Sequence, residues 1–159
     1  MGRHLPEGQG LSEPPQDPVF IVHSLAHAVA ALAAAAGVGR PIVLLSAPDA
    51  GIYAGPGWFK AVVEAAREAA PAAQFSAILD CGDDPGAAQG AFRAGIETVI
   101  FIGRADVAAR LAGIAAAKDA RLLTTRPDTL LDLGRWFFAD AETLRRQCAD
   151  WLASMRPIC

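Results

Sequence analysis

Short runs of apolar residues alternate with alanine-rich segments along the chain from residue 19 onward. Uninterrupted apolar runs of this kind are typical of strands that are buried on both faces of a parallel sheet. The segments between them have the composition and length of helices. The pattern therefore predicts repeated βα units. The predicted strands cover residues 19–23, 41–46, 75–80, 97–103 and 121–125, and the predicted helices cover residues 24–37, 58–70, 85–95, 104–120 and 139–155.

These units predict a mainly parallel five-stranded sheet in a single α/β domain that covers residues 18–159, after a flexible leader at residues 1–17. Five strands cannot close an eight-stranded barrel. The sheet is therefore either a partial TIM-like barrel or a rearranged, flavodoxin-like three-layer sandwich with strand order 2-1-3-4-5. We favour the second for a monomer, because its helices cover both faces. In a partial barrel, segment 127–155 could cover the bare face, or two chains could pair as a homodimer.

Composition excludes several classes of function. Hydrophobic residues make up 53% of the chain and the net charge is −3, so no basic patch favours nucleic acid or an anionic membrane. No apolar run approaches the roughly 20 residues that span a bilayer. The cysteines Cys81, Cys148 and Cys159 are widely spaced, which indicates reduced thiols rather than a disulfide framework. We therefore expect a cytoplasmic protein.

Residues with useful chemistry follow the predicted strands. The carboxyl ends of parallel strands lie at one edge of a sheet, where sites form in α/β proteins. Asp80 could act as an acid or base there, or could be a turn residue. Cys81 could be a nucleophile or a buried apolar residue. His23 could join them in one crevice, whereas a metal pair of His23 with His27 is doubtful because His23 ends a strand.

Glycine-rich segments supply the candidate ligand-binding residues. The loop at 49–58 could approach a ligand closely, although it lacks the order of a nucleotide-binding motif. Asp83 and Asp84 could also cap the next helix. Trp136, Phe137 and Phe138 are either core or subunit interface. The candidate ligand-binding residues are Ser46, Gly51, Tyr53, Gly55, Gly82 and Asp83.

Four stretches in this order resemble the class II fructose-bisphosphate aldolases, which are TIM barrels. They read IVLLSAPDAGIYAG, AVVEAA, ILDCGDD and AFRAGIETVIFIG. The resemblance extends over roughly residues 19–155. It implies that Asp80 occupies the position of the acid/base aspartate, Cys81 that of a zinc-binding histidine, and Ser46 that of the serine ending the second strand.

This chain also departs from that family. His23 stands where the family usually has asparagine, and Ile102 replaces an aspartate. The family's zinc needs two further histidines from later strands, and its phosphate site uses late loops, whereas the three histidines here are His4, His23 and His27, all before the second predicted strand. We therefore expect no cofactor, no metal and no aldolase activity.

Three functions remain open from the sequence. The first is a small α/β protein that binds a small metabolite or a partner at the strand carboxyl ends. The second is a metal-dependent, aldolase-like lyase whose site is completed across a homodimer, with zinc held by Cys81 and His23. The third is a structural or interaction protein without a small-molecule site.

Overall fold

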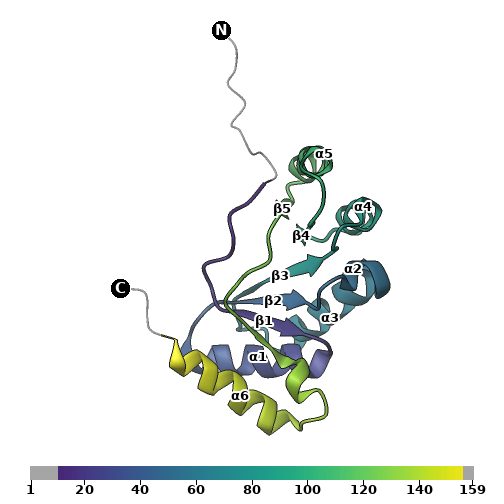
Figure 1. The fold of residues 1–159 in the computed structure, drawn as a ribbon. Coiled ribbons are helices and arrows are strands. Elements are labelled where there is room, and N and C mark those ends of the chain that lie inside the picture. The colour runs from purple at the N-terminus through teal and green to yellow at the C-terminus, as the bar shows by residue number, and fades with distance from the viewer. Residues whose placement is uncertain (1–10, 156–159) are drawn as a thin grey trace. The chain divides into compact units, whose positions relative to one another are not determined.

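The computed structural model describes residues 11–155. Helices and strands alternate along the chain, as the sequence pattern predicts (Figure 1). The elements are β1 (Val19–Val22), α1 (Leu25–Val38), β2 (Ile42–Ser46), α2 (Ala50–Tyr53), α3 (Pro56–Ala69), β3 (Phe75–Asp80), α4 (Pro85–Arg93), β4 (Thr98–Ile100), α5 (Ala105–Ala117), β5 (Arg121–Leu123), β6 (Leu130–Asp132), the 3-10 helix η1 (Leu133–Trp136) and α6 (Ala141–Ser154).

The chain forms two compact units that alternate along the sequence. Of the described residues, 11–14, 48–59 and 78–126 belong to unit 1, and 15–47, 60–77 and 127–155 belong to unit 2. The first ten residues of the predicted leader, and Cys159, lie outside the described residues. Both the flexible leader and the single domain stay predictions.

In unit 2, β1 is flanked by β2 on one edge and by β6 on the other, and both pairings are parallel. Val19 aligns with Val43 and with Leu130. The flavodoxin-like order is therefore wrong, because it places β1 between β2 and β3. The prediction of five strands missed β6, a short run that follows the loop after β5. The parallel βα architecture itself is confirmed, with strand neighbours of the kind a partial barrel has.

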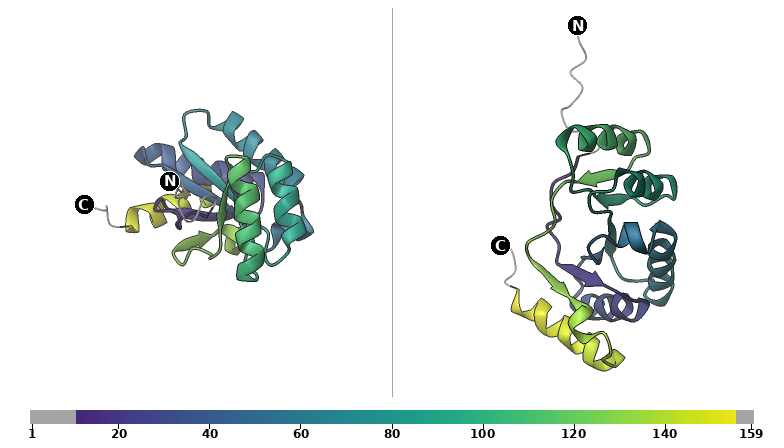
Figure 2. Two further views of the ribbon diagram at one scale, coloured as in Figure 1. Left: turned by 90° about the horizontal axis from the view of Figure 1, so that it is seen from above. Right: turned by 45° about the vertical axis from the view of Figure 1, so that its right-hand side comes forward.

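In unit 1, β4 lies between β3 and β5, again with parallel pairing. Leu79 aligns with Val99, and Val99 aligns with Leu122. Leu11 forms an isolated parallel bridge with Leu122, whose carbonyl accepts the Ser12 N–H at 2.9 Å. Helices α4 and α5 pack against each other and against β4 and β5, respectively (Figure 2).

Helix ends follow local sequence signals. The Ser24 hydroxyl accepts the His27 N–H at the start of α1, and Asp84 caps α4 with Pro85 in the first turn. The predicted end of α1 at Gly37 is wrong, because the left-handed C-cap is Gly39 (φ +63°) and the helix runs to Val38. The expected loop at 49–58 is interrupted by α2, and α3 already begins at Pro56.

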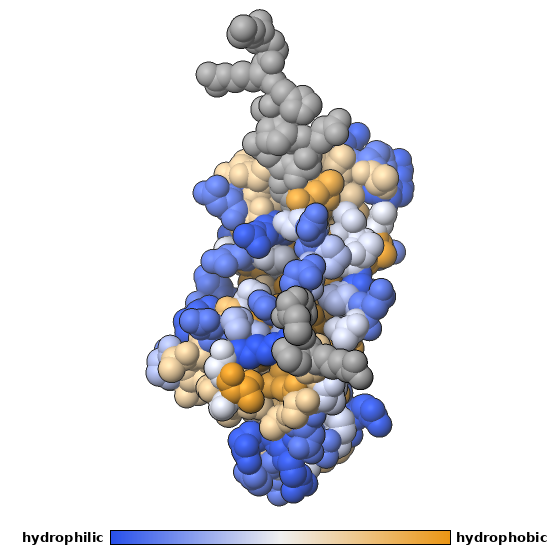
Figure 3. Space-filling view, turned by 90° about the vertical axis from the view of Figure 1, so that its left-hand side faces the viewer, coloured by the Kyte–Doolittle hydropathy of each residue, from blue (hydrophilic) through white to orange (hydrophobic). Residues whose placement is uncertain are grey.

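The core of unit 2 forms around β1 and β2, which are buried along their full length. Helix α6 packs along α1, and the Trp151 ring meets the Phe20 ring edge-on with centroids 5.0 Å apart. The C-terminal segment thus extends the strand ladder with β6 and covers α1 with α6. On the face shown in Figure 3, hydrophilic side chains are interspersed with small hydrophobic patches. Among residues 11–155 no helix has the length and apolarity of a membrane-crossing segment.

Candidate functional site

Asp80 ends β3 and lies at the centre of a cluster of polar contacts in unit 1. Its side chain is only 1% exposed. The Oδ1 atom accepts the backbone N–H of Gly82 at 2.9 Å and that of Asp49 at 3.1 Å. A buried carboxylate needs such donors, because burial without them costs several kcal/mol. These two bonds tie the loop after β3 to the loop that begins α2.

Arg126, from the loop after β5, also binds the carboxylate of Asp80. Its Nε donates to Asp80 Oδ2 at 2.7 Å, and its Nη2 donates to Asp80 Oδ1 at 3.1 Å. The same Nη2 donates to Asp49 Oδ1 at 3.2 Å. The hydrogen bond to Asp80 is the largest cause that raises the pKa of Arg126. This bidentate pair is the strong form of a charge-assisted hydrogen bond.

Two glycines allow the loops to approach this closely. Gly82 has φ +54°, and a Cβ there would collide with Asp49 Oδ1. A Cβ at Gly51 would lie 2.5 Å from Cys81 Sγ. The predicted site residues Gly51, Asp80, Cys81 and Gly82 are therefore brought together, but their glycines make room for other protein atoms at these points.

Cys81 is fully buried. Burial, and then the charges of Asp80 and Asp84, raise the pKa of its thiol to about 12. At neutral pH the side chain is therefore a protonated thiol, whereas nucleophiles and zinc ligands are thiolates. Among residues 11–155 no three histidine, cysteine or carboxylate side chains form a group that could hold a metal. The residues present therefore do not fit the zinc site that the aldolase resemblance implies.

The exposed rim of the cluster has negative character. The pKa of Tyr53 is raised by burial and then by the charges of Asp49 and Asp80. Formally, Asp49 and Asp80 carry two negative charges against the one positive charge of Arg126. The side chains of Asp49 and Arg126 are 53% and 41% exposed, and Tyr53 is 68% exposed. Within the described part of the chain, Arg126 Nη1 donates to no protein acceptor, so this rim presents a donor, a carboxylate and a phenol to solvent.

The other predicted residues of unit 1 have looser surroundings. Asp83 is exposed, while Asp84 accepts the Ala87 N–H at 3.0 Å as the cap of α4. Gly55 adopts φ +85°, and nothing lies within 4 Å of the place that a Cβ would take there. Ligand binding by these residues stays a prediction.

His23 belongs to unit 2, where it follows β1 directly. Its Nε2 lies 2.6 Å from Asp132 Oδ1, and its backbone N–H donates to His27 Nδ1 at 3.0 Å. His27 is fully buried, and its Nε2 has no hydrogen-bond partner among the described residues. Its ring meets the Phe137 ring edge-on with centroids 5.7 Å apart. Burial first, and then His23, lower the pKa of His27.

Ser46 also belongs to unit 2. Its side chain is fully buried, and its Oγ donates to the Ala47 carbonyl at 3.1 Å. The proposed meeting of His23 with Asp80 and Cys81 stays a prediction, because the histidine and the other two residues belong to different units. Phe137 and Phe138 are 51% and 98% exposed, so they are not core residues.

Sequence reasoning missed the two residues that hold the candidates in place, Arg126 and Asp132. Arg126 follows β5 and Asp132 is the last residue of β6, and this place at the carboxyl end of a short strand is the available signal for them. Arg126 is also the first charged residue after β5. A buried Asp80 requires a cationic partner, so an arginine at a strand end of the same sheet was the residue to look for.

This arrangement defines an α/β protein of parallel βα units with a polar cluster at its strand carboxyl ends. The fold is similar to that of a structure from Coccidioides immitis described as a "putative fructose-1,6-biphosphate aldolase", with a TM-score of 0.57 and 19% sequence identity. The match covers 75% of this chain and 46% of that chain, so this chain spans less than half of that structure. No family model matches the sequence, and no curated protein matches it either. The aldolase resemblance is thus confirmed at the level of the fold.

Proposed function

We propose that this chain is a non-catalytic, aldolase-like α/β protein that binds a small polar ligand without phosphate groups at the rim of the Asp80 cluster. The observation that carries the proposal is the bidentate contact of Arg126 with buried Asp80. A general base must be able to reach a substrate proton. Asp80 has its oxygens engaged by Arg126 and by backbone N–H groups instead, so it acts as a structural tie between loops.

The ligand class follows from the charges at the rim. Asp49 and Asp80 carry two formal negative charges against one positive charge on Arg126, and both raise the pKa of nearby Tyr53. Like charges repel, so a bisphosphate is disfavoured at this rim. Hydroxyl-rich or amine-bearing molecules fit better, because Asp49 can accept hydrogen bonds from their O–H or N–H groups and Arg126 Nη1 can donate hydrogen bonds to their oxygens.

Tyr53 provides a direct test, because it is the only tyrosine in the chain. Protein labelled with ¹³C-tyrosine gives one ring resonance that reports on the rim. Titration with D-fructose and with fructose 1,6-bisphosphate compares two molecules that differ only in their phosphates. We expect D-fructose to shift the resonance, and the bisphosphate to shift it less at equal concentration and ionic strength.

The variant Asp49→Asn is the matched control for the role of charge. It removes one negative charge and keeps the side-chain oxygen that faces Arg126. With this variant, we expect the shifts of the Tyr53 resonance that D-fructose and fructose 1,6-bisphosphate cause to become more similar. A bisphosphate that bound more tightly than fructose to the unaltered protein would contradict the proposed ligand class.

Catalysis is tested separately. We expect no cleavage of fructose 1,6-bisphosphate with or without added zinc in a coupled assay. Turnover that Asp80→Asn abolished would overturn the non-catalytic assignment. The Cys81 thiol is buried and has a raised pKa. It therefore does not support a lyase that uses Cys81 as a zinc ligand.

A further inference from the structure

The outward face of α1 carries no polar side chain. The only polar residue of this helix is His27, which is buried. Most helices at a protein surface have a polar outer face, and one that is apolar all round is normally covered on all sides. Before the last residue of the helix, Val38, the outward positions are Leu25, Ala26, Val29, Ala33, Ala36 and Gly37.

Gly37 indicates that something other than the described residues 11–155 covers the face. It lies inside α1 with an ordinary helical φ, and nothing lies within 4 Å of where its Cβ would be. Glycine inside a helix costs about 1 kcal/mol relative to alanine. No contact or backbone conformation in unit 2 requires it, whereas a helix packed closely from outside would.

The order of side-chain sizes favours a second copy of this chain as the partner. The larger residues Leu25 and Val29 lie in the first half of the face, and small residues follow them up to Gly37. These outward positions are also symmetric about residue 31. We propose that two copies pair through α1 in antiparallel orientation about a twofold axis, so that each large residue of one copy meets a small residue of the other.

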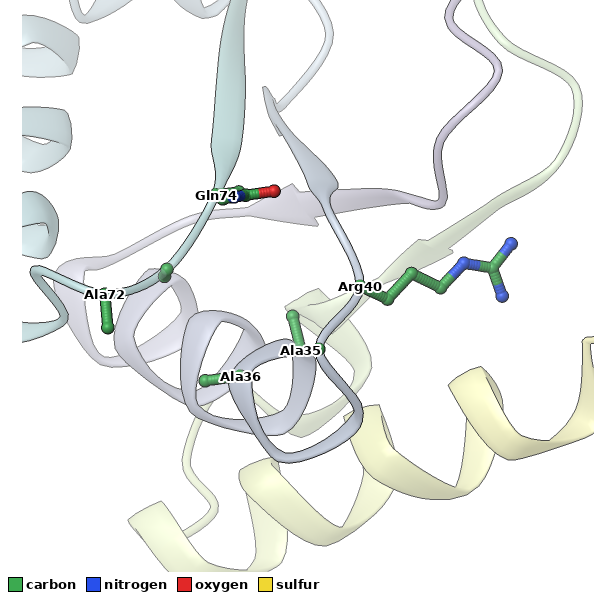
Figure 4. A pocket seen from close by; sticks show the side chains of 7 residues that line it. Ala35, Ala36, Arg40, Ala72 and Gln74 are labelled. Atoms are coloured by element: carbon green, nitrogen blue, oxygen red, sulfur yellow. The ribbon is translucent and has the colours of Figure 1, made fainter.

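In this pairing Leu25 meets Gly37, Ala26 meets Ala36, and Val29 meets Ala33 near the axis. A hollow of about 190 Å³ lies beside Ala36 at the C-terminal end of α1. Figure 4 shows Ala35 and Ala36 on one wall of it, with the Arg40 side chain extending away. The partner's Leu25 side chain fits at the edge of this hollow, because the alanines leave it lined by small groups.

A second groove continues the apolar face toward α6. It has a volume of about 450 Å³ and lies between Leu25–Ala33 of α1 and the first turns of α6. Glu142 and Arg145 form an ion pair at its edge, 2.6 Å apart. An apolar centre with a charged rim is the usual composition of a protein interface. The absence of charge on α1 itself fits a partner that is equally apolar, as a second copy is.

The area of the α1 face limits the affinity expected for the dimer. Stable complexes bury about 800 Å² per partner, and one helix face with its adjoining grooves offers less. The dissociation constant of the dimer should therefore be on the order of micromolar or larger, so that the dimer forms only at higher protein concentrations. The homodimer that we expect from composition is thereby assigned to a helix face.

Sedimentation equilibrium of the full chain between about 1 and 300 μM tests the pairing, over a range chosen to span weak interfaces. We expect the mean mass to rise from monomer toward dimer. Ala33→Glu places a charge at the centre of the face and should leave only monomer. Ala109→Glu, at an exposed alanine of α5, is the matched control and should dimerise like the unaltered protein.

Orientation is tested by disulfide formation in a Cys159→Ser background. Mixed Ala26→Cys and Ala36→Cys proteins should cross-link to each other faster than either does to itself. Circular dichroism checks that all variants stay folded. An unaltered protein that remains monomeric throughout, or a dimer that survives Ala33→Glu, would overturn the proposal, and a monomer would mean that a different molecule covers α1. Faster self-linking of Ala26→Cys would overturn the antiparallel arrangement.

Discussion

The carboxyl ends of β3 and β1 each carry a residue suited to proton chemistry, and each residue is held by a charge from a distant segment. At β3, Asp80 is 1% exposed and receives a bidentate contact from Arg126. At β1, the His23 side chain is 28% exposed and has one side-chain contact, with Asp132. The first pair is buried on the carboxylate side, and the second is open to water on both sides.

This difference in burial makes the Arg126–Asp80 pair important for stability, whereas the His23–Asp132 pair contributes little. Water screens the His23–Asp132 pair, so its loss should cost little. Asp80 has no access to water that could replace Arg126, so removal of the arginine would leave a buried charge. Residues that look equally reactive in the sequence can therefore differ greatly in what the fold requires of them.

The largest effect is expected for Arg126→Met, which removes the positive partner of Asp80. We expect a loss of about 3 kcal/mol in the free energy of unfolding, at the low end for a broken buried pair because Arg126 is partly exposed. Urea denaturation at pH 7 measures it. Arg145→Met, which breaks the exposed pair with Glu142, is the matched control and should change little. Equal losses in the two variants would contradict the comparison.

A smaller loss is expected for Gly82→Ala, which tests the close approach of the two loops around Asp80. The new Cβ meets Asp49 Oδ1 in a left-handed conformation, so we expect a cost of about 1–3 kcal/mol. Gly55→Ala is the control, because Gly55 has φ +85° but open space around it. The two variants share the cost of the left-handed backbone, so the difference between them measures the clash. No difference in their thermal midpoints would contradict tight loop packing.

The region around β1 should make stability depend on pH through His27. Its folded-state pKa lies below the ordinary value of 6.5, so the unfolded chain binds this proton more readily. The stabilisation is fully present above the unfolded pKa and is lost as the pH falls from there toward the folded pKa. One proton limits the slope to about 1.4 kcal/mol per pH unit. His27→Asn, whose Oδ1 can replace Nδ1, should reduce this dependence in urea titrations between pH 7.5 and 5.5.

The smallest effect is expected for Asp132→Asn. It removes the charge beside His23 and keeps an oxygen that can accept the Gly134 N–H, now at 2.8 Å. We expect a loss below about 1 kcal/mol, as is usual for a partly exposed pair. Urea denaturation at pH 6 and low salt gives the best chance of detecting it. A loss as large as that of Arg126→Met would show that this pair, too, is structural.

Local signals made much of the fold predictable. Ser24 and Asp84 cap their helices through neighbouring backbone groups, and apolar runs mark the longer strands. The failures involve distant residues. β6 is a short run that pairs with β1, a strand far earlier in the chain. The Arg126–Asp80 pair joins residues 46 positions apart, and no local pattern specifies such a contact. The family resemblance pointed to Asp80 but could not show that Arg126 engages its carboxylate.

The pairing of β1 with β6 has a consequence for the newly made chain. During synthesis, β1 leaves the ribosome long before β6, the strand that covers its second edge. Until then that edge offers unpaired N–H and C=O groups to other strands, which is the usual start of aggregation. Pairings between such distant segments also form slowly. Expression of fragments that lack residues 127–155 should therefore yield insoluble protein, and slower translation should prolong the need for chaperones.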